Sequence, residues 1–437
     1  MKAHHFLNLI VLGSVLGCGK DNVVGPHLPT VELQALRVEA IEVALKVTLT
    51  DTLTPRTFAL RRDGVVIASG EMTANQTTVV DTTVRPAQSY LYQAFRTSGG
   101  EAVDSSDVLS VTTLDTTSHN YTWDIQTIGV FQSSLSDVWG TAPTNVYAVG
   151  RVEMPDGETQ SNVIHFDGNA WRTVTEAAFD TGFAYGEFGG IYGFSENDIW
   201  VVGTNVLHWE GNTWKPLAFT LRRTGPGSAI VITLNEVLSG NQFTAVWGPS
   251  SQDLFAVGVG GVIVHYDGQR WTMMASGTEL SFQDVWGSSS TDVYAVAMEF
   301  FSAQWQVVHY DGRSWQPVVV DPITLNRPGG VWGISRDMVY IASDFVFRFD
   351  GLKWKRLEVP NKLYNMGGVE GSAFNDVFVV GSFGVVLHWN GATWRQYEDL
   401  LRPDGGRLLR RIWTDGREVF IVGSSAIEGV ILHGKRF

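Results

Sequence analysis

The sequence has little cysteine, little positive charge and no long apolar run. Cys18 is the only cysteine among 437 residues, and Asp and Glu outnumber Lys and Arg by 45 to 31, for a formal net charge of −14. A nucleic-acid phosphate backbone would be repelled by such a surface, so no nucleic-acid partner is expected. No polybasic patch is present to attract an anionic membrane. The apolar run of residues 6–16 is too short to cross a bilayer as a helix.

What the chain does contain indicates a folded protein of short strands. Apolar residues make up 44% of the sequence and charged residues 17%, which is typical of folded chains. Glycine (47 residues) and tryptophan (16 residues) are abundant, and this combination favours many tight turns between strands. The length is too great for one ordinary core, so two or three domains are expected.

The N-terminal segment carries the features of an export signal. Lys2 precedes the apolar run, and Val15-Leu16-Gly17-Cys18 follows it. This segment resembles a bacterial lipoprotein signal, which implies cleavage after residue 17 and lipidation of Cys18. The alternative is an ordinary secretory signal that contains a cysteine by chance. We favour the lipoprotein, because a lone thiol is unusual in an exported chain.

The same resemblance implies a place in the cell. An exported protein with several acyl chains on Cys18 would be anchored stably in the cell envelope by lipid alone. Gly19 stands where some lipoproteins carry the Asp that retains them at the inner membrane, so we expect the outer membrane. Residues 18–30 are rich in Gly, Pro and polar residues and are predicted to be a tether.

Residues 31–115 alternate apolar and polar residues in short runs, as in residues 36–47, with a turn at Asp63-Gly64. This pattern predicts antiparallel strands in a small sandwich. The segment resembles a fibronectin type III domain, and the resemblance implies that Tyr90 or Tyr92 forms a tyrosine corner. We expect a spacer; a binding module is the alternative.

A repeated unit begins at Tyr121. Its form is clear in residues 285–287 (Val-Trp-Gly), 292–296, 309–312 (His-Tyr-Asp-Gly) and Trp315. Seven such units recur, each with four predicted strands, termed a to d, so the fold class is all-β: a small fibronectin type III-like sandwich followed by a seven-bladed β-propeller over 121–437. The seventh unit lacks its Trp strand, so we expect residues 121–127 to pair into the last blade and close the ring.

The repeated tryptophans and histidines are interpreted as structural. Large flat side chains at fixed positions fill the wedge between neighbouring blades. One histidine per blade lies too far from the others to form a zinc site, so no metal and no cofactor is expected. The repeated tryptophans are Trp123, Trp139, Trp171, Trp214, Trp247, Trp271, Trp286, Trp315, Trp332, Trp354, Trp394 and Trp413.

The Asp-Gly-x-x-Trp element resembles a degenerate Asp-box of BNR-like sialidase propellers, and the whole repeat is also similar to WD-repeat-like propellers and to repeats in exported bacterial propellers. Sialidase activity would need an arginine cluster and a tyrosine–carboxylate pair, for which we find no motif. Oxidase propellers with a cysteine-linked tyrosine are excluded, because the only cysteine lies in the signal.

Loop lengths predict a binding face. In an antiparallel blade the b–c and d–a loops share one face, and the long loops (151–162, 217–242, 297–306 and 398–407) all belong to these two classes. Variable loops on a rigid scaffold are where binding usually occurs. The candidate contacts are Glu153, Asp156, Glu158, Arg222, Arg223, Phe300, Phe301, Trp305 and Arg402. The alternative for the aromatic residues is packing within their own loops.

The sequence therefore predicts a non-enzymatic envelope lipoprotein whose propeller binds a protein or glycan. One alternative is a glycan-active enzyme of sialidase-like type, which would need two carboxyls about 5 to 9.5 Å apart or a Tyr–Glu pair. The other alternative is a scaffold in an envelope assembly.

Overall fold

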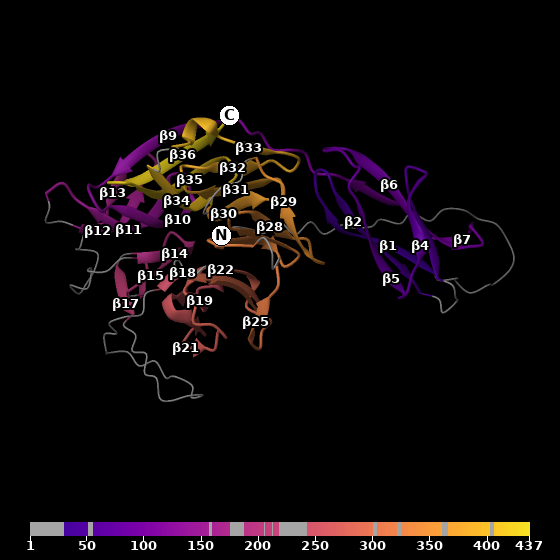
Figure 1. Cartoon of the computed structure of the whole chain (residues 1–437), viewed down its shortest axis with the longest axis horizontal. Helices are drawn as coiled ribbons and strands as arrows, with labels where there is room; N and C mark the ends of the chain where they lie inside the picture. The colour runs from indigo at the N-terminus through magenta and orange to yellow at the C-terminus, as the bar shows by residue number, and fades with distance from the viewer. Residues whose placement is uncertain are drawn as a thin grey trace. The chain divides into compact units, whose positions relative to one another are not determined.

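The computed structural model describes residues 30–50, 56–156, 160–174, 188–204, 206–211, 213–217, 243–299, 304–320, 325–360, 366–402 and 406–437. The chain divides into two compact units, Met1–Thr117 and Ser118–Phe437. In the residues just named both units are all-β, and the second unit also has two single-turn 3-10 helices, η2 (Val259–Gly261) and η3 (Glu398–Leu400) (Figure 1). Within these ranges no helix is both long and apolar enough to cross a membrane.

The first unit is a two-sheet sandwich. One sheet has the order β1-β2-β5, and the other has the order β4-β3-β6-β7 with β8 also paired to β6. The strands are β1 (Val31–Val38), β2 (Val43–Leu49), β3 (Thr57–Arg62), β4 (Val65–Glu71), β5 (Gln76–Asp81), β6 (Ser89–Ser98), β7 (Glu101–Ser105) and β8 (Leu109–Thr112). Both sheets contribute to one core, in which Leu45, Leu60 and Tyr92 are fully buried.

The two tyrosines of β6 have different roles. Tyr90 Oη accepts a hydrogen bond from the backbone N–H of Arg85, five residues upstream, at 2.8 Å. This is the bond that defines a tyrosine corner. Tyr92 is buried and donates its hydroxyl to Asp81 at 2.9 Å, and burial raises the pKa of Tyr92. Tyr90 therefore fixes the loop before β6, while Tyr92 ties the two sheets together.

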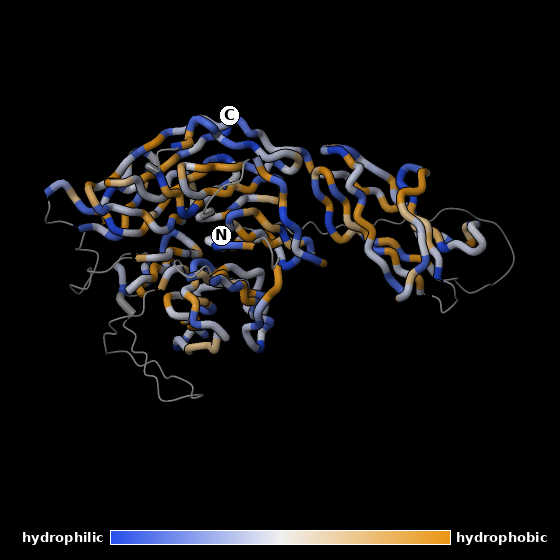
Figure 2. The backbone as a smooth tube through the Cα atoms, viewed as in Figure 1, coloured by the Kyte–Doolittle hydropathy of each residue, from blue (hydrophilic) through white to orange (hydrophobic). Residues whose placement is uncertain are grey.

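The second unit is a ring of seven four-stranded antiparallel sheets, numbered here in chain order. The innermost strands contact one another in sequence, and β34 contacts β10, so the ring is closed (Figure 1). Comparison with Figure 1 shows that the apolar residues, orange in Figure 2, lie along the strands of the sheets. The sheets are: sheet 1, β10 (Ser134–Ala142), β11 (Asn145–Glu153), β12 (Gln160–Phe166), β13 (Trp171–Thr173); sheet 2, β14 (Phe188–Ser195), β15 (Asp198–Gly203), β16 (Val206–Trp209), β17 (Trp214–Leu217); sheet 3, β18 (Phe243–Ser250), β19 (Asp253–Gly258), β20 (Ile263–Tyr266), β21 (Trp271–Met274); sheet 4, β22 (Phe282–Ser289), β23 (Asp292–Glu299), β24 (Gln304–Tyr310), β25 (Trp315–Val318); sheet 5, β26 (Gly330–Ser335), β27 (Met338–Ala342), β28 (Val346–Phe349), β29 (Trp354–Leu357); sheet 6, β30 (Met366–Ala373), β31 (Asp376–Gly381), β32 (Val386–Trp389), β33 (Trp394–Gln396); and sheet 7, β34 (Arg407–Thr414), β35 (Glu418–Ser425), β36 (Gly429–Arg436), β9 (Tyr121–Ile128).

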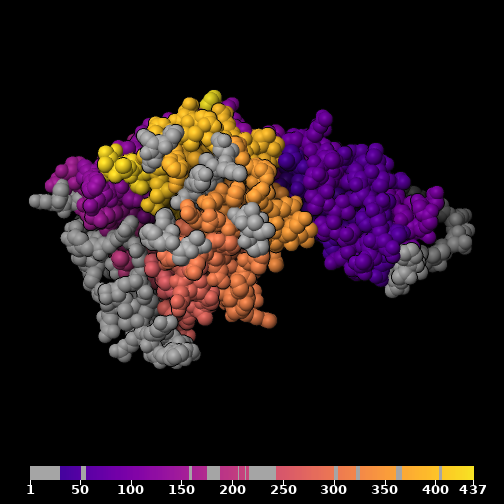
Figure 3. All heavy atoms as spheres, in the orientation of Figure 1, coloured from indigo at the N-terminus to yellow at the C-terminus, as the bar shows by residue number. Residues whose placement is uncertain are grey.

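Sheet 7 joins the two ends of the second unit. β9, at the start of the unit, pairs antiparallel with β36 over its whole length, from Tyr121↔Arg436 to Ile128↔Gly429. The space-filling view shows the first propeller strands, in magenta, beside the yellow last sheet (Figure 3). Main-chain hydrogen bonds therefore close the ring and leave no free edge on β36.

The Val-Trp-Gly element interlocks adjacent sheets. Trp286 of sheet 4 lies so close to Gly333 of sheet 5 that a Cβ on Gly333 would be 2.6 Å from the Trp286 Cη2 atom. The glycine is needed because the indole of the preceding sheet occupies the space of a side chain. The same arrangement joins Trp139 to Gly193, Trp247 to Gly287, Trp332 to Gly371 and, across the ring closure, Trp413 to Gly140.

The repeated histidines each bind within their own sheet. In six sheets the histidine Nε2 lies 2.6–2.9 Å from a side-chain oxygen at the start of the second strand. In sheet 5, Met338 replaces the oxygen-bearing residue and Arg348 replaces the histidine, so the two positions change together. The pairs are His165–Asn145, His208–Asp198, His265–Asp253, His309–Asp292, His388–Asp376 and His433–Glu418. Among the described residues, no group of three or more His, Cys, Asp or Glu side chains is placed to hold a metal ion.

Candidate functional site: the long-loop face

The antiparallel order of each sheet gives the propeller two unlike faces. The turns that join first to second and third to fourth strands lie on one face, which we name the short-turn face. The loops that join second to third strands, and each sheet to the next, lie on the other, which we name the long-loop face. Its described segments are 129–133, 154–156, 174, 204, 259–262, 275–281, 319–320, 325–329, 343–345, 358–360, 382–385, 397–402, 406 and 426–428.

The short-turn face is built from nearly identical turns. Asp267 Oδ1 accepts hydrogen bonds from the backbone N–H groups of Gln269 and Arg270, at 3.0 and 2.8 Å, and Gly268 adopts a left-handed φ of 86°. These backbone hydrogen bonds lower the pKa of Asp267. Glycine adopts this conformation without steric cost, so the turn is unstrained. The turn glycines Gly168, Gly211, Gly312, Gly351 and Gly391 share this conformation.

The long-loop face carries the strained backbone of the propeller. In the described part of the second unit, the non-glycine residues with positive φ are Gln132 (77°), Arg327 (48°) and Phe383 (62°), and all three lie in long-loop segments. A left-handed conformation costs an L-residue roughly 1–2 kcal/mol. Such strain persists only where the surroundings hold it, and it clusters at functional sites.

Exposed apolar side chains also gather on this face. Phe131 is 65% exposed and Val319 is 77% exposed, and Val259, Phe383 and Ile427 are exposed as well. At the short-turn end of the described sheets, the large apolar side chains exposed to this extent are Ile334 near the end of β26, Leu352 and Phe437. Exposed apolar residues that gather on one face mark interaction surfaces.

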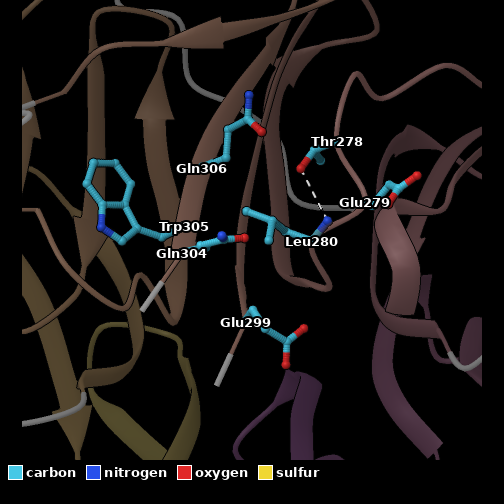
Figure 4. Close-up of a pocket in the computed structure, with 7 residues that line it drawn as sticks. All are labelled: Thr278, Glu279, Leu280, Glu299, Gln304, Trp305 and Gln306. Atoms are coloured by element: carbon cyan, nitrogen blue, oxygen red, sulfur yellow. Dashed lines mark hydrogen bonds between the residues drawn. The ribbon is translucent and has the colours of Figure 1, made fainter. Parts of the chain in front are cut away.

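An open hollow of about 740 Å³ lies on the long-loop face between sheets 3 and 4. Its walls are the segment before β22 and the hairpin of β23 and β24 (Figure 4). β23 has eight residues, whereas the corresponding β19 has six, so the hairpin extends beyond its neighbour. The lining residues are Thr278, Glu279, Leu280, Glu299, Gln304, Trp305 and Gln306.

Strand register decides which side chains enter the hollow. Glu299 pairs with Gln304, and Met298 pairs with Trp305. Paired residues of an antiparallel ladder point to the same side and alternate along the strand, so the Glu299–Gln304 pair and Gln306 share one side. The Trp305 indole points away from the other lining residues and packs against the core between sheets 4 and 5 (Figure 4). Trp305 therefore supports the hairpin and leaves the hollow polar.

The structure spreads the predicted contact residues around the ring. Glu153, the last residue of β11 in sheet 1, accepts a hydrogen bond from Arg151 Nε at 2.6 Å, and Asp156 lies in the loop that follows. Arg402, between sheets 6 and 7, donates its backbone N–H to the Phe383 carbonyl at 2.6 Å. They are not brought to one point with Trp305. Glu158, Arg222, Arg223, Phe300, Phe301 and the predicted lipidation site Cys18 lie outside the described residues.

Sequence reasoning missed a charged cluster at the axis of the ring. Arg411 of sheet 7 donates to the backbone carbonyls of Gln283 at 2.6 Å and Gly367 at 3.1 Å, and its guanidinium lies 3.6 Å from the Asp284 carboxylate. Arg411 thereby contacts sheets 4 and 6 from sheet 7. This side chain holds the innermost strands together across the axis.

Two aspartates complete the axial cluster. Asp137 accepts the backbone N–H of Ile191 in the next sheet at 2.9 Å, and Asp284 does the same for Val331 at 3.0 Å. Burial raises the pKa of Asp137 to about 7 and also raises that of Asp284, while the Arg411 charge opposes both rises. Both carboxylates are thus committed to the backbone of the neighbouring sheet.

The repeat itself contains a signal for this cluster. The residue directly before the Val-Trp-Gly element faces the axis, and across the seven sheets it is small in four and charged in three. An alignment of the repeats at this position would have singled out the charged residues. The residues in order are Asp137, Gly190, Ala245, Asp284, Gly330, Gly368 and Arg411.

Comparisons with known proteins show the fold. No protein-family model matches the sequence, and no curated protein matches it. The structure of YCF48 bound to D1 peptide is similar with a TM-score of 0.50 and 15% identity, covering 72% of this chain and 97% of that chain. The WD40 β-propeller domain of Doa1 is similar with a TM-score of 0.50 and 10% identity, covering 72% of this chain and 98% of that chain. The structural neighbours of this chain are therefore YCF48-type and WD40-type β-propellers.

Proposed function

We propose that this chain is a non-enzymatic lipoprotein of the cell envelope whose propeller binds a protein through the long-loop face. The observation that carries the proposal is the contrast between the two faces. Among the described residues, the short-turn face repeats one unstrained turn, whereas the long-loop face holds the strained residues, the hollow and five of the nine exposed large apolar side chains of the second unit. Binding surfaces are usually built on such variable loops above a rigid scaffold.

A protein ligand is favoured over a glycan by two observations. YCF48, a propeller of the same fold, has been seen with a bound peptide. The large side chains exposed on the long-loop face are mainly aliphatic or phenyl groups, such as Val319 and Phe131, and the one tryptophan at the hollow packs inward. Apolar groups of this kind suit a protein surface.

The proposal also covers the domain organisation of the chain and its location in the cell. The seven sheets form a seven-bladed propeller over 121–437, closed by β9. The strand order of the first sandwich and the Tyr90 hydrogen bond support a fibronectin type III-like domain over 31–115 that acts as a spacer. Residues 1–17 are the signal, Cys18 carries the lipid, 18–30 form the tether, and the protein is anchored in the outer membrane.

Photo-crosslinking tests the binding face, with residues of equal exposure compared between the two faces. A benzophenone amino acid replaces Phe131 or Phe383 on the long-loop face, and Leu352 or Ile334 on the short-turn face. The two members of each pair are equally exposed, at 65% for Phe131 and Leu352 and at 39% and 38% for Phe383 and Ile334. Each full-length variant is irradiated in the envelope of its host, and adducts are identified by mass spectrometry.

We expect one partner protein to crosslink at positions 131 and 383 and not at 352 and 334. Equal crosslinking on both faces, or crosslinking on the short-turn face alone, would contradict the proposal. Adducts that resist protease and yield to glycosidases would instead identify a glycan ligand. The structure does not favour a glycan-active enzyme, because the carboxylates of Asp137 and Asp284 at the axis are bound to backbone N–H groups.

A further inference from the structure

Residues 118–120, which we name the strap, lie against sheets 6 and 7 just before β9 begins. The hydroxyl of Tyr397 donates to the His119 carbonyl at 2.9 Å, and the backbone N–H of Phe437 donates to the Asn120 carbonyl at 3.2 Å. The ring of His119 lies edge-on to the ring of His388, with 4.8 Å between their centroids. The strap is thus held by its backbone and by the side chain of His119.

A chain of hydrogen bonds fixes the position of the proton on His388. This residue is fully buried, and its Nε2 lies 2.9 Å from Oδ1 of Asp376. Arg436 and Ser372 also donate to the Asp376 carboxylate. Because a carboxylate only accepts hydrogen bonds, His388 carries its proton on Nε2 and presents an unprotonated Nδ1 to the strap.

The two histidine rings meet through equivalent atoms. Nδ1 of His119 lies 2.8 Å from Nδ1 of His388, and Nε2 of His119 lies 3.0 Å from the Thr393 hydroxyl. Since Nδ1 of His388 is unprotonated, Nδ1 of His119 donates to it, and Nε2 of His119 accepts from Thr393. Two neutral rings therefore satisfy every contact, whereas two charged rings would place two N–H groups head to head.

The surroundings of the histidine pair disfavour positive charge. Burial lowers the pKa of His119 to about 4, and His388 and the charges of Arg395 and Arg436 act in the same direction. Burial also lowers the pKa of His388, although the Asp376 carboxylate opposes this change. The titratable and charged groups around the pair are Asp376 of β31, Arg395 of β33, Tyr397 after β33, Arg436 of β36 and Tyr121 of β9.

Sheet 6 differs from other sheets at the corner that receives the strap. In sheet 1 the turn residue Asp167 pairs with Arg172 of the fourth strand at 3.1 Å. In sheet 6 the corresponding turn residue is Asn390, which offers no carboxylate to Arg395. Arg395 donates instead to the His119 carbonyl at 3.4 Å. The sequence of this corner is thus adapted to the strap.

We infer that the strap is a pH-sensitive latch, which is docked on sheet 6 at neutral pH and is released in mild acid. Once released, His119 is solvated and titrates like an ordinary histidine, near pH 6.5. A histidine whose pKa is lowered by docking favours the docked form above its free pKa and loses this contribution as the pH falls toward its docked pKa. Release therefore develops between about pH 6.5 and pH 4, and it frees the chain that leads into β9. The latch lies at the short-turn end of the sheets and is independent of the binding proposed for the long-loop face.

Hydrogen exchange measured by mass spectrometry on the full-length protein at pH 7.5 and pH 5 tests the latch. Rates are corrected for the intrinsic effect of pH, peptides covering 118–123 and 434–437 report on the strap, and β23 reports on the rest of the propeller. The test variant is His119→Gln, because the glutamine amide supplies a donor and an acceptor but does not titrate. The matched control is His265→Gln, at the position of sheet 3 that corresponds to His388. Thermal unfolding at pH 7.5 checks that each variant is folded.

We expect the protection of the strap to fall about tenfold or more between pH 7.5 and pH 5 in the wild-type protein, since a free histidine is almost fully charged at pH 5 and the docked one is not. β23 should keep its protection, His265→Gln should behave like the wild type, and His119→Gln should keep the strap protected at both pH values. Unchanged protection of the wild-type strap, the same loss in His119→Gln, or an equal loss in β23 would overturn the inference.

Nitrogen NMR of the full-length protein labelled with ¹⁵N-histidine gives a second readout that needs no folded variant. At pH 7.5 His119 should be neutral and protonated on Nδ1, and His388 should be neutral and protonated on Nε2. A charge on either ring at this pH, or the opposite pair of tautomers, would also overturn the inference.

Discussion

Replacement of Arg411 by Met should weaken the propeller strongly and in a pH-dependent way. The guanidinium is largely buried, with 16% of its side chain exposed, and it bonds to four backbone carbonyls besides facing the Asp284 carboxylate. Met fills the volume but leaves Asp284 and Asp137 without a cation. Removing one partner of a buried charged pair costs about 3–5 kcal/mol, a large part of the roughly 5–15 kcal/mol by which proteins are usually stable.

The pH dependence follows from the direction of the pKa shifts. Burial already raises the folded-state pKa of Asp137 to about 7, and the Arg411 charge opposes the rise. Without Arg411 this pKa rises further. A carboxyl whose pKa is raised by folding stabilises the folded state less as the pH increases from its unfolded pKa toward its folded pKa. The loss caused by Arg411→Met should therefore be larger at pH 8 than at pH 5.

Urea unfolding followed by tryptophan fluorescence measures this loss. All 16 tryptophans lie at or beyond residue 123, so the signal reports the propeller and not the first unit. The control is Arg336→Met, because Arg336 is 75% exposed at its side chain on the short-turn face. A loss below about 1 kcal/mol, or an equal loss at both pH values, would refute the assignment of Arg411 as the axial cation.

Three further predictions test other parts of the structure. Asp137→Asn should reduce the decline in stability between about pH 4 and pH 7, because the raised pKa of Asp137 produces it; urea titrations across this range measure the change. Gly333→Ala should destabilise the propeller by about 1–3 kcal/mol, since the new Cβ would lie 2.6 Å from both Trp286 and the Met338 carbonyl; an unchanged urea midpoint would contradict the interlock. Tyr90→Phe should cost the first unit about 0.5–1.5 kcal/mol through loss of the bond to Arg85; faster hydrogen exchange in β5 and β6 would show it.

The propeller fold follows from local signals that repeat. Each Val-Trp-Gly element marks an innermost strand, and each Asp-Gly turn marks the connection between the third and fourth strands of a sheet. Because these signals recur in register, the sequence alone predicts strand order and the pairing partner of Tyr121–Ile128. A single domain without repeats would not have allowed such a prediction, since long-range pairing leaves little local trace.

The candidate site was less predictable, because it depends on register and on contacts across the ring. Trp305 was singled out as an aromatic outside the repeat, but its pairing with Met298 turns the indole into the core and Glu299 into the hollow. One residue of register decides which of these side chains faces a ligand. Arg411 and Asp284 lie 127 positions apart, and their contact depends on closure of the whole ring.

The same closure explains how the long-loop face can tolerate strain. Main-chain pairing of β9 with β36, the Trp–Gly contacts between sheets and the bonds of Arg411 each act between elements distant in sequence, so the ring resists local adjustment. A rigid ring can hold Phe383 in a left-handed conformation that an isolated turn would abandon. Loops so held present their side chains in a fixed arrangement and lose little entropy when a partner binds. The axial cluster would thus supply the rigidity that the binding proposed for the long-loop face requires.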